Sequence, residues 1–412
     1  MGKLPKNFAL LKRRENQRIS RRRLQESSSI SSNSPAENER IELSTSDFNW
    51  KDQDWAPSLS AVFKILFSIR LSASLWSIIS DCDEVYNYWE PLHLVLFKRG
   101  FQTWEYSPIY AIRSWLYILL YAAPAKFFML FFYESKVPLF FSIRFFISLF
   151  TLFSELFLYR AICQRISNSI GRTFILFSMF SNAMFGASCA FLPSSFSMER
   201  FLFPIYPYIC LLSAFSLDFL YKILNNTKTQ FANIFYITIL FIFIITSFSR
   251  IAALHRNYSG LLDTYKEFNN KINTFEDLML KVENNSTKIP LLRLCIGKEW
   301  HRFPSSFFLP ENRKNNRGVE MRFIKSEFRA LLPDIFPKGL TVAEITQQVP
   351  IHQNDENREQ MERYVPLNSC NFLIDLAGME PTEFEPDYSK MVSSIKFNQL
   401  KLEKLMYIQH SS

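Results

Sequence analysis

Long apolar stretches separated by short polar loops fill the middle of the chain. Each stretch has about 20 residues, which is the length that a helix needs to cross the hydrocarbon core of a bilayer. The stretches lie near residues 57–79, 111–133, 139–162, 173–192, 201–221 and 231–253. This pattern predicts a polytopic α-helical membrane protein with residues 57–253 as its transmembrane region.

The two ends of the chain differ from this apolar middle. Residues 1–56 are polar, Ser-rich and mostly basic, which predicts a disordered tail in the cytosol. Residues 254–412 are charged and mixed, and their number suffices for one compact domain. Their patterns predict strands near 288–295 and 371–376 and helices near 340–349 and 395–405. We therefore expect a C-terminal domain of mixed α/β structure.

Basic residues set the direction of the helices. Arginine or lysine residues flank the loops 163–172 and 222–230, and positive charge marks cytosolic loops. Six crossings from a cytosolic N-terminus would place the first of these loops in the lumen, so one stretch must fail to cross. The segment 107–133 contains two prolines, Arg113 and Lys126, which predicts a helix lying in the membrane interface. The alternative is an ordinary spanning helix kinked at Pro124.

Five crossings bring the polar segments of interest to one side of the membrane. These segments are the first loop, 80–110, the turn 191–196, the pair Glu199 and Arg200, and the C-terminal domain, 254–412. We expect all of them in the lumen, because the N-terminal tail is cytosolic and the number of crossings is odd.

Composition agrees with a membrane protein and argues against a nucleic-acid-binding one. The chain has 43 Phe and 17 Tyr but only 9 Gly. Its net charge of +9 comes partly from the N-terminal arm, which is almost free of aromatic residues and precedes no nucleic-acid-binding motif. The six cysteines have no metal-ligand spacing. Cys295 and Cys370 could form a disulfide in a lumenal tail, or remain two buried thiols.

Acidic and aromatic residues gather in the first loop, directly after the first apolar stretch. The run Asp81-Cys-Asp-Glu-Val-Tyr-Asn-Tyr-Trp-Glu-Pro91 has three acids within four residues. Charge beside a bilayer is costly, so Asp83 and Glu84 are candidate catalytic residues. Aromatic rings stack on sugar faces and carboxylates bind hydroxyls, which makes carbohydrate binding the favoured interpretation of the neighbouring residues: Trp89, Glu90, Trp104, Glu105 and Tyr106. An aromatic belt at the lipid headgroups explains Trp104 and Tyr106 equally well, but not the acids.

A sugar transfer with inversion requires one carboxylate as general base. A phosphate leaving group needs cationic neighbours, and Arg200, Lys298, His301 and Arg302 are available. The alternatives are an Arg200 that only snorkels at a helix end and a solvated surface at 298–302. No metal-ligand set is predicted, and a requirement for a divalent ion is left open.

Several long motifs resemble one enzyme family. They are DCDEVYNYWEP, GFQTWEYSPIYAIRSWLY, AFLPSSF, ERFLFPIYP and IGKEWHRFPSSFFLP. Together they resemble the endoplasmic-reticulum α-1,2-mannosyltransferases of lipid-linked oligosaccharide assembly, in the glycosyltransferase C superfamily. The enzymes that build glycosylphosphatidylinositol anchors share only part of this set.

The resemblance implies a helical membrane enzyme of the endoplasmic reticulum with a lumenal active site. Dolichyl phosphate mannose would be the donor and a lipid-linked oligosaccharide the acceptor. By the same resemblance, Asp83 would be the general base, Glu84 would help to position the acceptor, and Arg200 would face the lipid phosphate.

The chain departs from the family pattern at one place. In relatives, further transmembrane helices and a loop separate the FLPSSF turn from the ERFLFP motif, whereas here Met198 is followed directly by Glu199 and the family's His-Lys is missing. This is typical of an exon-skipped isoform or an incomplete gene model. The alternatives are a shortened, non-catalytic form that binds glycan or partner enzymes, and a mannosyltransferase of glycosylphosphatidylinositol-anchor synthesis. A transporter has least support, because its usual signs, paired broken helices in repeated halves or charges at mid-membrane, are absent from the sequence.

Overall fold

A computed structural model describes most of the chain after residue 54. The described residues are 55–79, 81–132, 135–192, 205–227, 229–282, 292–298, 300–312, 317–348, 353–375 and 380–388. The N-terminal tail, Arg200 and the helix expected near 395–405 lie outside these ranges.

Helices dominate the described residues. The α-helices are α2 (Leu59–Trp76), α3 (Cys82–Glu84), α4 (Glu90–Phe97), α5 (Trp115–Met129), α6 (Lys136–Arg165), α7 (Asn168–Phe180), α8 (Asn182–Ala187), α9 (Tyr206–Thr227), α10 (Thr229–Tyr258), α11 (Gly260–Val282) and α12 (Val342–Gln347). A π-helical turn, η1 (Val85–Trp89), joins α3 to α4. Short 3₁₀ turns are η2 (Trp104–Tyr106), η5 (Trp300–Arg302), η6 (Ser306–Phe308), η8 (Met361–Arg363) and η9 (Leu367–Ser369).

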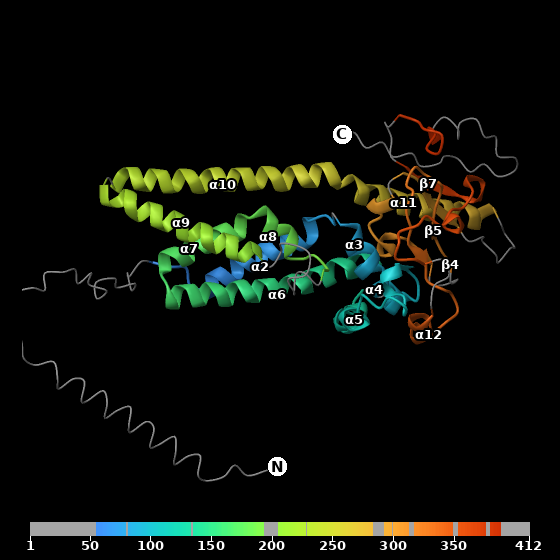
Figure 1. Cartoon of the computed structure of the whole chain (residues 1–412), viewed down its shortest axis with the longest axis horizontal. Helices are drawn as coiled ribbons and strands as arrows, with labels where there is room; N and C mark the ends of the chain where they lie inside the picture. The colour runs from blue at the N-terminus through green and yellow to red at the C-terminus, as the bar shows by residue number, and fades with distance from the viewer. Residues whose placement is uncertain are drawn as a thin grey trace, which may run out of the picture. The chain divides into compact units, whose positions relative to one another are not determined.

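Four described helices are long and apolar enough to cross a membrane, as expected of a polytopic membrane protein. They are α2, α6, α9 and the continuous stretch from Thr229 to Ile272 that begins with α10. Figure 1 shows α2, α6, α9 and α10 running along one another as a bundle. Large apolar side chains such as Phe157, Leu212 and Phe241 are exposed on this bundle. Such exposure suits a surface in contact with lipid.

The stretch 173–192 is not the single spanning helix that the apolar pattern predicts. It divides into α7 and α8, because Ser181 has extended backbone angles and its side chain accepts a hydrogen bond from Met184 N. The divided segment still runs from one end of the bundle to the other. Arg172 Nη1 donates to Trp55 O near the start of α2, and Phe191 N donates to Glu84 in α3.

A buried ion pair joins two of the candidate spans inside the bundle. Arg70 of α2 donates to Glu155 of α6 through Nε (3.0 Å) and Nη2 (2.5 Å). Its Nη1 also donates to Met184 O at 3.2 Å, and Ser178 Oγ donates to Glu155. Both charged side chains are almost fully buried. Paired and hydrogen-bonded charges are tolerated in an apolar interior, and this pair ties α2 and α6 to the break between α7 and α8.

The segment 107–133 forms a helix only from Trp115 onward. Ser114 caps α5 by accepting a hydrogen bond from Leu116 N at 3.2 Å, and the preceding residues form a turn. With 15 residues, α5 is shorter than the four candidate spans. Figure 1 views α5 nearly end-on while α6 and α10 cross the picture, so α5 lies across the bundle axis. Its place in the membrane interface stays a prediction.

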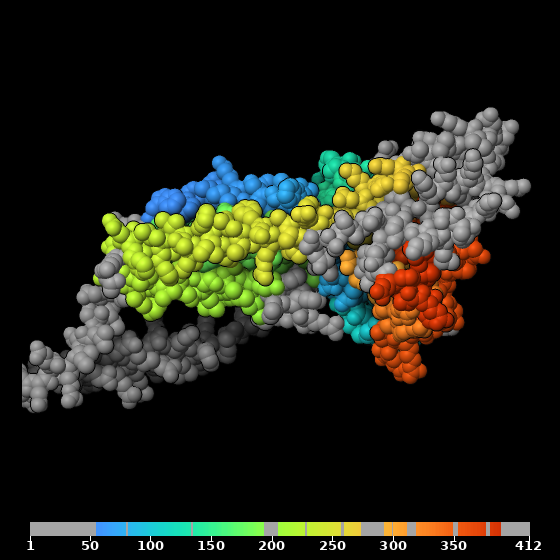
Figure 2. Space-filling model, turned by 90° about the horizontal axis from the view of Figure 1, so that it is seen from above, coloured from blue at the N-terminus to red at the C-terminus, as the bar shows by residue number. Residues whose placement is uncertain are grey.

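Small sheets gather at one end of the bundle. The strands are β1 (Phe101–Gln102), β2 (Arg293–Ile296), β3 (Glu311–Asn312), β4 (Arg317–Gly318), β5 (Glu320–Phe323), β6 (Asp334–Ile335) and β7 (Phe372–Ile374). The largest sheet has the order β5-β2-β7, with all strands parallel and Leu294 opposite both Met321 and Phe372. In Figure 2 the orange and red C-terminal residues lie beyond one end of the yellow and green helices.

The C-terminal residues and the first loop share one apolar core. Phe268 of α11 packs on Phe372 of β7, and Phe303 packs on Tyr86 and Phe101 of the first loop. Short antiparallel pairing of β1 with β6 joins the same two parts. A disulfide links Cys295 of β2 to Cys370, so of the two alternatives for these cysteines the pair is the one present. The strands expected near 288–295 and 371–376 correspond to β2 and β7, and the helix expected near 340–349 to α12.

Candidate active site at the end of the helix bundle

The acidic run begins with a tight, capped turn. The Asp81 side chain accepts a hydrogen bond from Asp83 N at 2.9 Å and so caps α3. The π-helical turn η1, which is wider than an α-helical turn by about one residue, then leads into the regular helix α4, which begins at Glu90. Such π-turns are frequent at functional sites, because the extra residue re-aims side chains. Here Asp83 is half-buried whereas the adjacent Glu84 is buried.

The Glu84 carboxylate is hydrogen-bonded inside the protein. Oε1 accepts hydrogen bonds from Trp89 Nε1 at 3.0 Å and from Phe191 N at 2.9 Å. Burial raises the pKa of this carboxyl, and the charge of Arg144 opposes the shift. Glu84 therefore anchors the chain after α8 beside the acidic run, and a positioning role suits it better than direct contact with substrate.

Asp83 lines a polar cavity of about 130 Å³. The first loop supplies one wall and the C-terminal residues supply the other. The lining residues are Cys82, Asp83, Tyr86, Asn87, Thr103, Trp104, Glu105, Trp300, Leu331, Leu332, Pro333, Gln353 and Asn357. A carboxylate beside hydroxyl, amide and indole groups is suited to binding a sugar and taking a proton from it.

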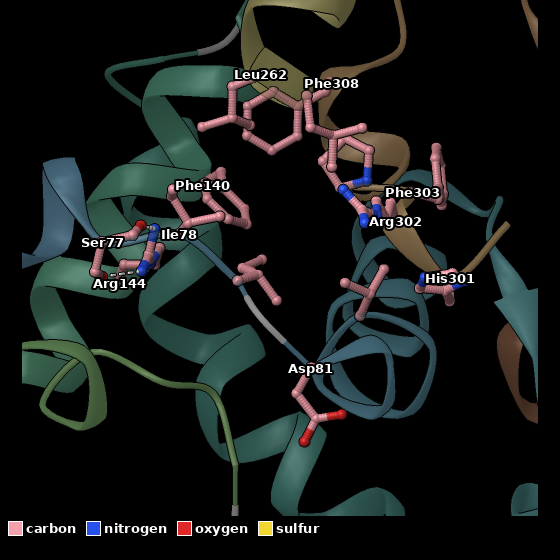
Figure 3. A pocket seen from close by; sticks show the side chains of 14 residues that line it. Ser77, Ile78, Asp81, Phe140, Arg144, Leu262, His301, Arg302, Phe303 and Phe308 are labelled. Carbon is pink, nitrogen blue, oxygen red and sulfur yellow. Dashed lines mark hydrogen bonds between the residues drawn. The ribbon is translucent and has the colours of Figure 1, made fainter. Parts of the chain in front are cut away.

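A second, smaller cavity of about 30 Å³ lies on the other side of the acidic run. Arg144, His301, Arg302 and Asp81 are its charged or titratable lining groups, and most of the other lining residues are apolar. Figure 3 shows Arg144 on one side of the cavity and His301 and Arg302 on the opposite side, with Leu262 and Phe308 at the end away from Asp81. Two guanidinium groups beside apolar side chains are suited to a phosphate that carries a lipid chain.

Arg144 is held rigidly at the edge of this cavity. Its Nη1 donates to Ser77 O at 2.7 Å, and its Nη2 donates to Ser77 Oγ and lies 3.2 Å from Cys189 Sγ. The Arg144 Nε atom is buried and has no partner among the described residues. The sequence signal for this residue was a charge within the apolar stretch 139–162, and reading the stretch by its length alone missed it.

Two residues expected to bind substrate are structural instead. Trp89 is fully buried, with its ring 4.2 Å from that of Phe140, so no sugar can stack on it. Glu90 is also fully buried, and both of its oxygens accept hydrogen bonds from Phe101, Ser305 and Ser306. Glu90 joins the first loop to the C-terminal residues, and its carboxylate has no room for a substrate.

The residues Trp104, Glu105 and Tyr106 of the first loop include both cavity-lining and structural side chains. Trp104 lines the polar cavity, as expected of a sugar-binding residue. Glu105 also lines it, but its carboxylate pairs with Arg113 Nε at 2.8 Å. Tyr106 is buried, and its hydroxyl donates to Asn87 O at 2.5 Å, so it is structural rather than substrate-binding.

The expected cationic residues have three different outcomes. His301 lines the smaller cavity together with Arg302. The Lys298 side chain is buried, and its Nζ lies 3.7 Å from Asp375 Oδ2. Lys298 therefore stabilises the C-terminal fold and is not placed to bind a phosphate. Arg200 lies outside the described residues.

Asp81, Cys82 and Asp83 form the one group among the described residues whose ligand atoms lie close enough to hold a metal ion, within 4.8 Å of one another. Burial, followed by the charges of Asp83 and Asp81, raises the pKa of the Cys82 thiol to about 11. A thiol must lose its proton to bind a metal, so this cysteine is a poor ligand near neutral pH.

Comparison with known proteins identifies relatives over most of the chain. The sequence profile of the Alg9-like mannosyltransferase family matches residues 61–198 and 199–310. The α-1,2-mannosyltransferase algn-9 of Caenorhabditis elegans is 31% identical over 524 aligned positions, which cover 84% of this chain and 85% of the relative. The α-1,2-mannosyltransferase ALG9 of Homo sapiens is 29% identical, over 85% of this chain and 84% of its own length. No solved structure matches.

The comparisons also agree with a missing internal block. The two matched segments meet at Met198 and Glu199, where the chain departs from the family pattern. The 524 positions aligned with the C. elegans relative exceed the 412 residues of this chain, so the relative contains residues that have no counterpart here.

Proposed function

The chain belongs to the Alg9-like mannosyltransferase family, and we propose that it transfers mannose from dolichyl phosphate mannose to a lipid-linked oligosaccharide by inverting α-1,2 transfer. It is a membrane glycosyltransferase whose donor and acceptor both carry lipids. The observation that carries the mechanism is the position of Asp83 in the wall of the polar cavity, with the arginine-lined cavity on the other side of the same turn.

Asp83 acts as the general base. An acceptor hydroxyl in the polar cavity attacks the anomeric carbon of the donor mannose, and the Asp83 carboxylate takes the hydroxyl proton. The bond from the anomeric carbon to the phosphate oxygen breaks, and the phosphate leaves with the electron pair. Glu84 supports this step indirectly, since it fixes the backbone of Phe191 and the indole of Trp89 around the acidic run.

The phosphate of the donor binds at the smaller cavity, which has to widen to admit it, because a volume of about 30 Å³ is less than a phosphate group needs. Arg144, Arg302 and His301 converge there, and positive charge stabilises the dolichyl phosphate that leaves. Leu261, Leu262 and Phe308 give the same cavity an apolar side for the start of the polyprenyl chain. Lys298 has no part in this step, because it pairs with Asp375.

The reaction takes place on the lumenal side of the endoplasmic-reticulum membrane. The first loop, 80–110, and the C-terminal residues face the lumen as one mixed α/β unit, and α5 lies in the interface. The disulfide between Cys295 and Cys370 supports this orientation, because disulfides persist in the oxidising lumen and are rare in the cytosol.

Transfer by the purified chain in lipid nanodiscs tests the proposal. With labelled dolichyl phosphate mannose and a lipid-linked oligosaccharide acceptor, the product is longer by one mannose that an α-1,2-mannosidase removes. Asp83→Asn lowers kcat by about 100-fold or more, since a positioned general base contributes about that much. Asp355→Asn, which removes an exposed carboxylate outside both cavities, leaves the rate unchanged. An Asp83→Asn variant with the wild-type rate would contradict the assigned base.

The same assay separates an active enzyme from the shortened, non-catalytic form that the junction at Met198 and Glu199 raises as an alternative. An active enzyme makes product from both lipid substrates. A wild-type chain that is folded but makes no product would refute mannose transfer and leave glycan binding as its function.

A further inference from the structure

The polar cavity beside Asp83 has a wall that none of the family motifs supplies. Leu331, Leu332, Pro333, Gln353 and Asn357 come from the C-terminal residues and face Asp83, Asn87 and Thr103 of the first loop. The segment 331–357 lies beyond the last residue that the family profile matches, residue 310.

Gln353 differs from the rest of this wall because no described residue forms a hydrogen bond with its side-chain amide. Both Nε2 and Oε1 are shielded from solvent, and neither has a hydrogen-bond partner among the described residues. A buried amide without partners destabilises a protein, so such a group needs a reason. An amide presents one donor group and one acceptor beside each other, which matches two neighbouring hydroxyls on a sugar ring.

Several other polar groups around the cavity are already engaged. Thr103 Oγ1 donates to Asn87 Oδ1 at 2.6 Å, and Glu105 pairs with Arg113. Asn357 Oδ1 accepts a hydrogen bond from Leu331 N at 3.1 Å. Gln353 therefore offers both a donor and an acceptor without partners among the described residues, on the side of the cavity opposite Asp83.

The loop that carries Gln353 is held in place. Asn354 Oδ1 accepts from Arg358 N at 2.8 Å, and Asn354 Nδ2 donates to Arg358 O at 3.2 Å, which closes the loop on itself. Asn357 has a left-handed backbone with φ of 55°, a conformation that asparagine tolerates better than most residues. Because the loop backbone is held by these bonds, only the Gln353 side chain has to rotate for its shielded amide to reach a sugar in the cavity.

The size of the cavity limits what enters it. With a volume of about 130 Å³, the cavity has room for one sugar unit at the end of a glycan and not for an extended glycan. The rings of Trp104 and Trp300 line the same space and provide surfaces for the apolar face of that sugar.

We propose that Gln353 binds the hydroxyls of the acceptor mannose that carries the attacking oxygen, and that it thereby determines which acceptor sugar is extended. This inference rests on the proposed function, because it assigns the acceptor to the cavity beside Asp83. It adds a specificity-determining residue from the C-terminal wall of the cavity to the base, Asp83, that the first loop supplies.

Gln353→Met tests this role, because methionine fills a similar volume without hydrogen-bonding groups. In nanodiscs the variant has a KM for the lipid-linked acceptor about tenfold higher than wild type, the equivalent of about 1.4 kcal/mol, as expected for the loss of one or two hydrogen bonds. The KM for dolichyl phosphate mannose is unchanged. The melting temperature is equal to that of wild type or higher, since the variant removes an unpaired buried amide. Gln347→Met, at an exposed position of α12, is the matched control and alters none of these values.

A binding measurement keeps the inference testable without turnover. Binding of α-linked mannotriose is followed by tryptophan fluorescence, since Trp104 and Trp300 line the cavity. Weaker binding by Gln353→Met than by wild type supports the inference even if wild type makes no product, an outcome that would refute only the transferase function. Equal binding by both, an unchanged acceptor KM, or a lower melting temperature of the variant with unchanged binding overturns the assignment of Gln353.

Discussion

Glu90 connects the first loop to the C-terminal part of the chain through one buried carboxylate, and its removal should loosen that connection. Oε1 accepts hydrogen bonds from Ser305 Oγ at 2.8 Å and Ser306 N at 2.6 Å. Oε2 accepts from Ser306 Oγ at 2.7 Å and Phe101 N at 3.1 Å. Gly100, with φ of 157°, lets the backbone pass so close to Glu90 that an added Cβ would lie 2.5 Å from Glu90 O.

The expected loss of stability follows from the number of hydrogen-bond donors that each substitution leaves unpaired. Glu90→Ala leaves the backbone N–H groups of Phe101 and Ser306 unpaired, whereas the two serine hydroxyls can rotate to other acceptors. Each buried unpaired N–H costs about 1–3 kcal/mol, so the total loss is about 2–6 kcal/mol. Glu90→Gln keeps one acceptor oxygen for Ser306 N and turns its amide NH₂ toward Phe101 N. One donor is stranded, and the loss is about 1–3 kcal/mol.

The assay must resolve local opening, because the chain has several regions and a single unfolding transition is not assured. Hydrogen exchange in nanodiscs reports the protection of the amides of Phe101 and Ser306. Both variants reduce protection there, Glu90→Ala more than Glu90→Gln, while amides in the middle of α6 are unchanged. Equal protection in wild type and Glu90→Ala would refute the reasoning.

The protonation of Glu90 adds a pH dependence with a definite sign. Burial raises the pKa of this carboxyl above its ordinary value of 4.5, so the folded protein holds the proton more tightly than the unfolded chain. The stabilisation is fully present below pH 4.5 and is lost as the pH rises through the folded-state pKa. Wild-type protection of Ser306 N therefore decreases as the pH rises from about 4.5, and Glu90→Gln, which does not titrate, shows a smaller decrease.

Three further predictions concern the bundle, the disulfide and the metal. Arg70→Leu alone lowers the free energy of unfolding by about 3–5 kcal/mol, because it leaves Glu155 buried and unpaired. The double variant Arg70→Leu, Glu155→Leu has a free energy of unfolding close to that of wild type. Denaturant titration in detergent compares the two variants, and equal losses would contradict the pairing. Replacing Cys295 and Cys370 together by serine lowers the stability of the C-terminal part by about 2–5 kcal/mol, as limited proteolysis measures, and dithiothreitol reproduces the loss in wild type only. EDTA leaves the transfer rate unchanged, because the Cys82 thiol is protonated and two carboxylates on one turn bind metal weakly; a rate that EDTA abolishes and Mn²⁺ restores would show a metal site.

The local sequence pattern was sufficient to predict the helices and strands whose formation depends on residues close together along the chain. The apolar stretches predicted α2, α6, α9 and α10, because a helix in lipid satisfies its own backbone hydrogen bonds and needs only length and apolar side chains. Short apolar runs likewise predicted β2 and β7. The stretch 173–192 failed as a single helix because Ser181 can cap both the end of α7 and the start of α8, and composition averaged over about 20 residues does not register one capping residue.

Sequence alone determined the class of protein and the location of the acidic run, since these follow from composition and from residues adjacent along the chain, whereas the role of Asp83 as general base was implied by the family resemblance. Which acids and aromatics line a cavity was decided by tertiary structure. Trp89 and Glu90 belong to the same acidic and aromatic run as Asp83, yet contacts with Phe140 and Ser306 bury them. Arg144 and Gln353 became candidates only when folding brought residues far apart along the chain to the two sides of one turn. Burial and hydrogen bonding depend on these distant partners, and no local pattern of residues encodes them.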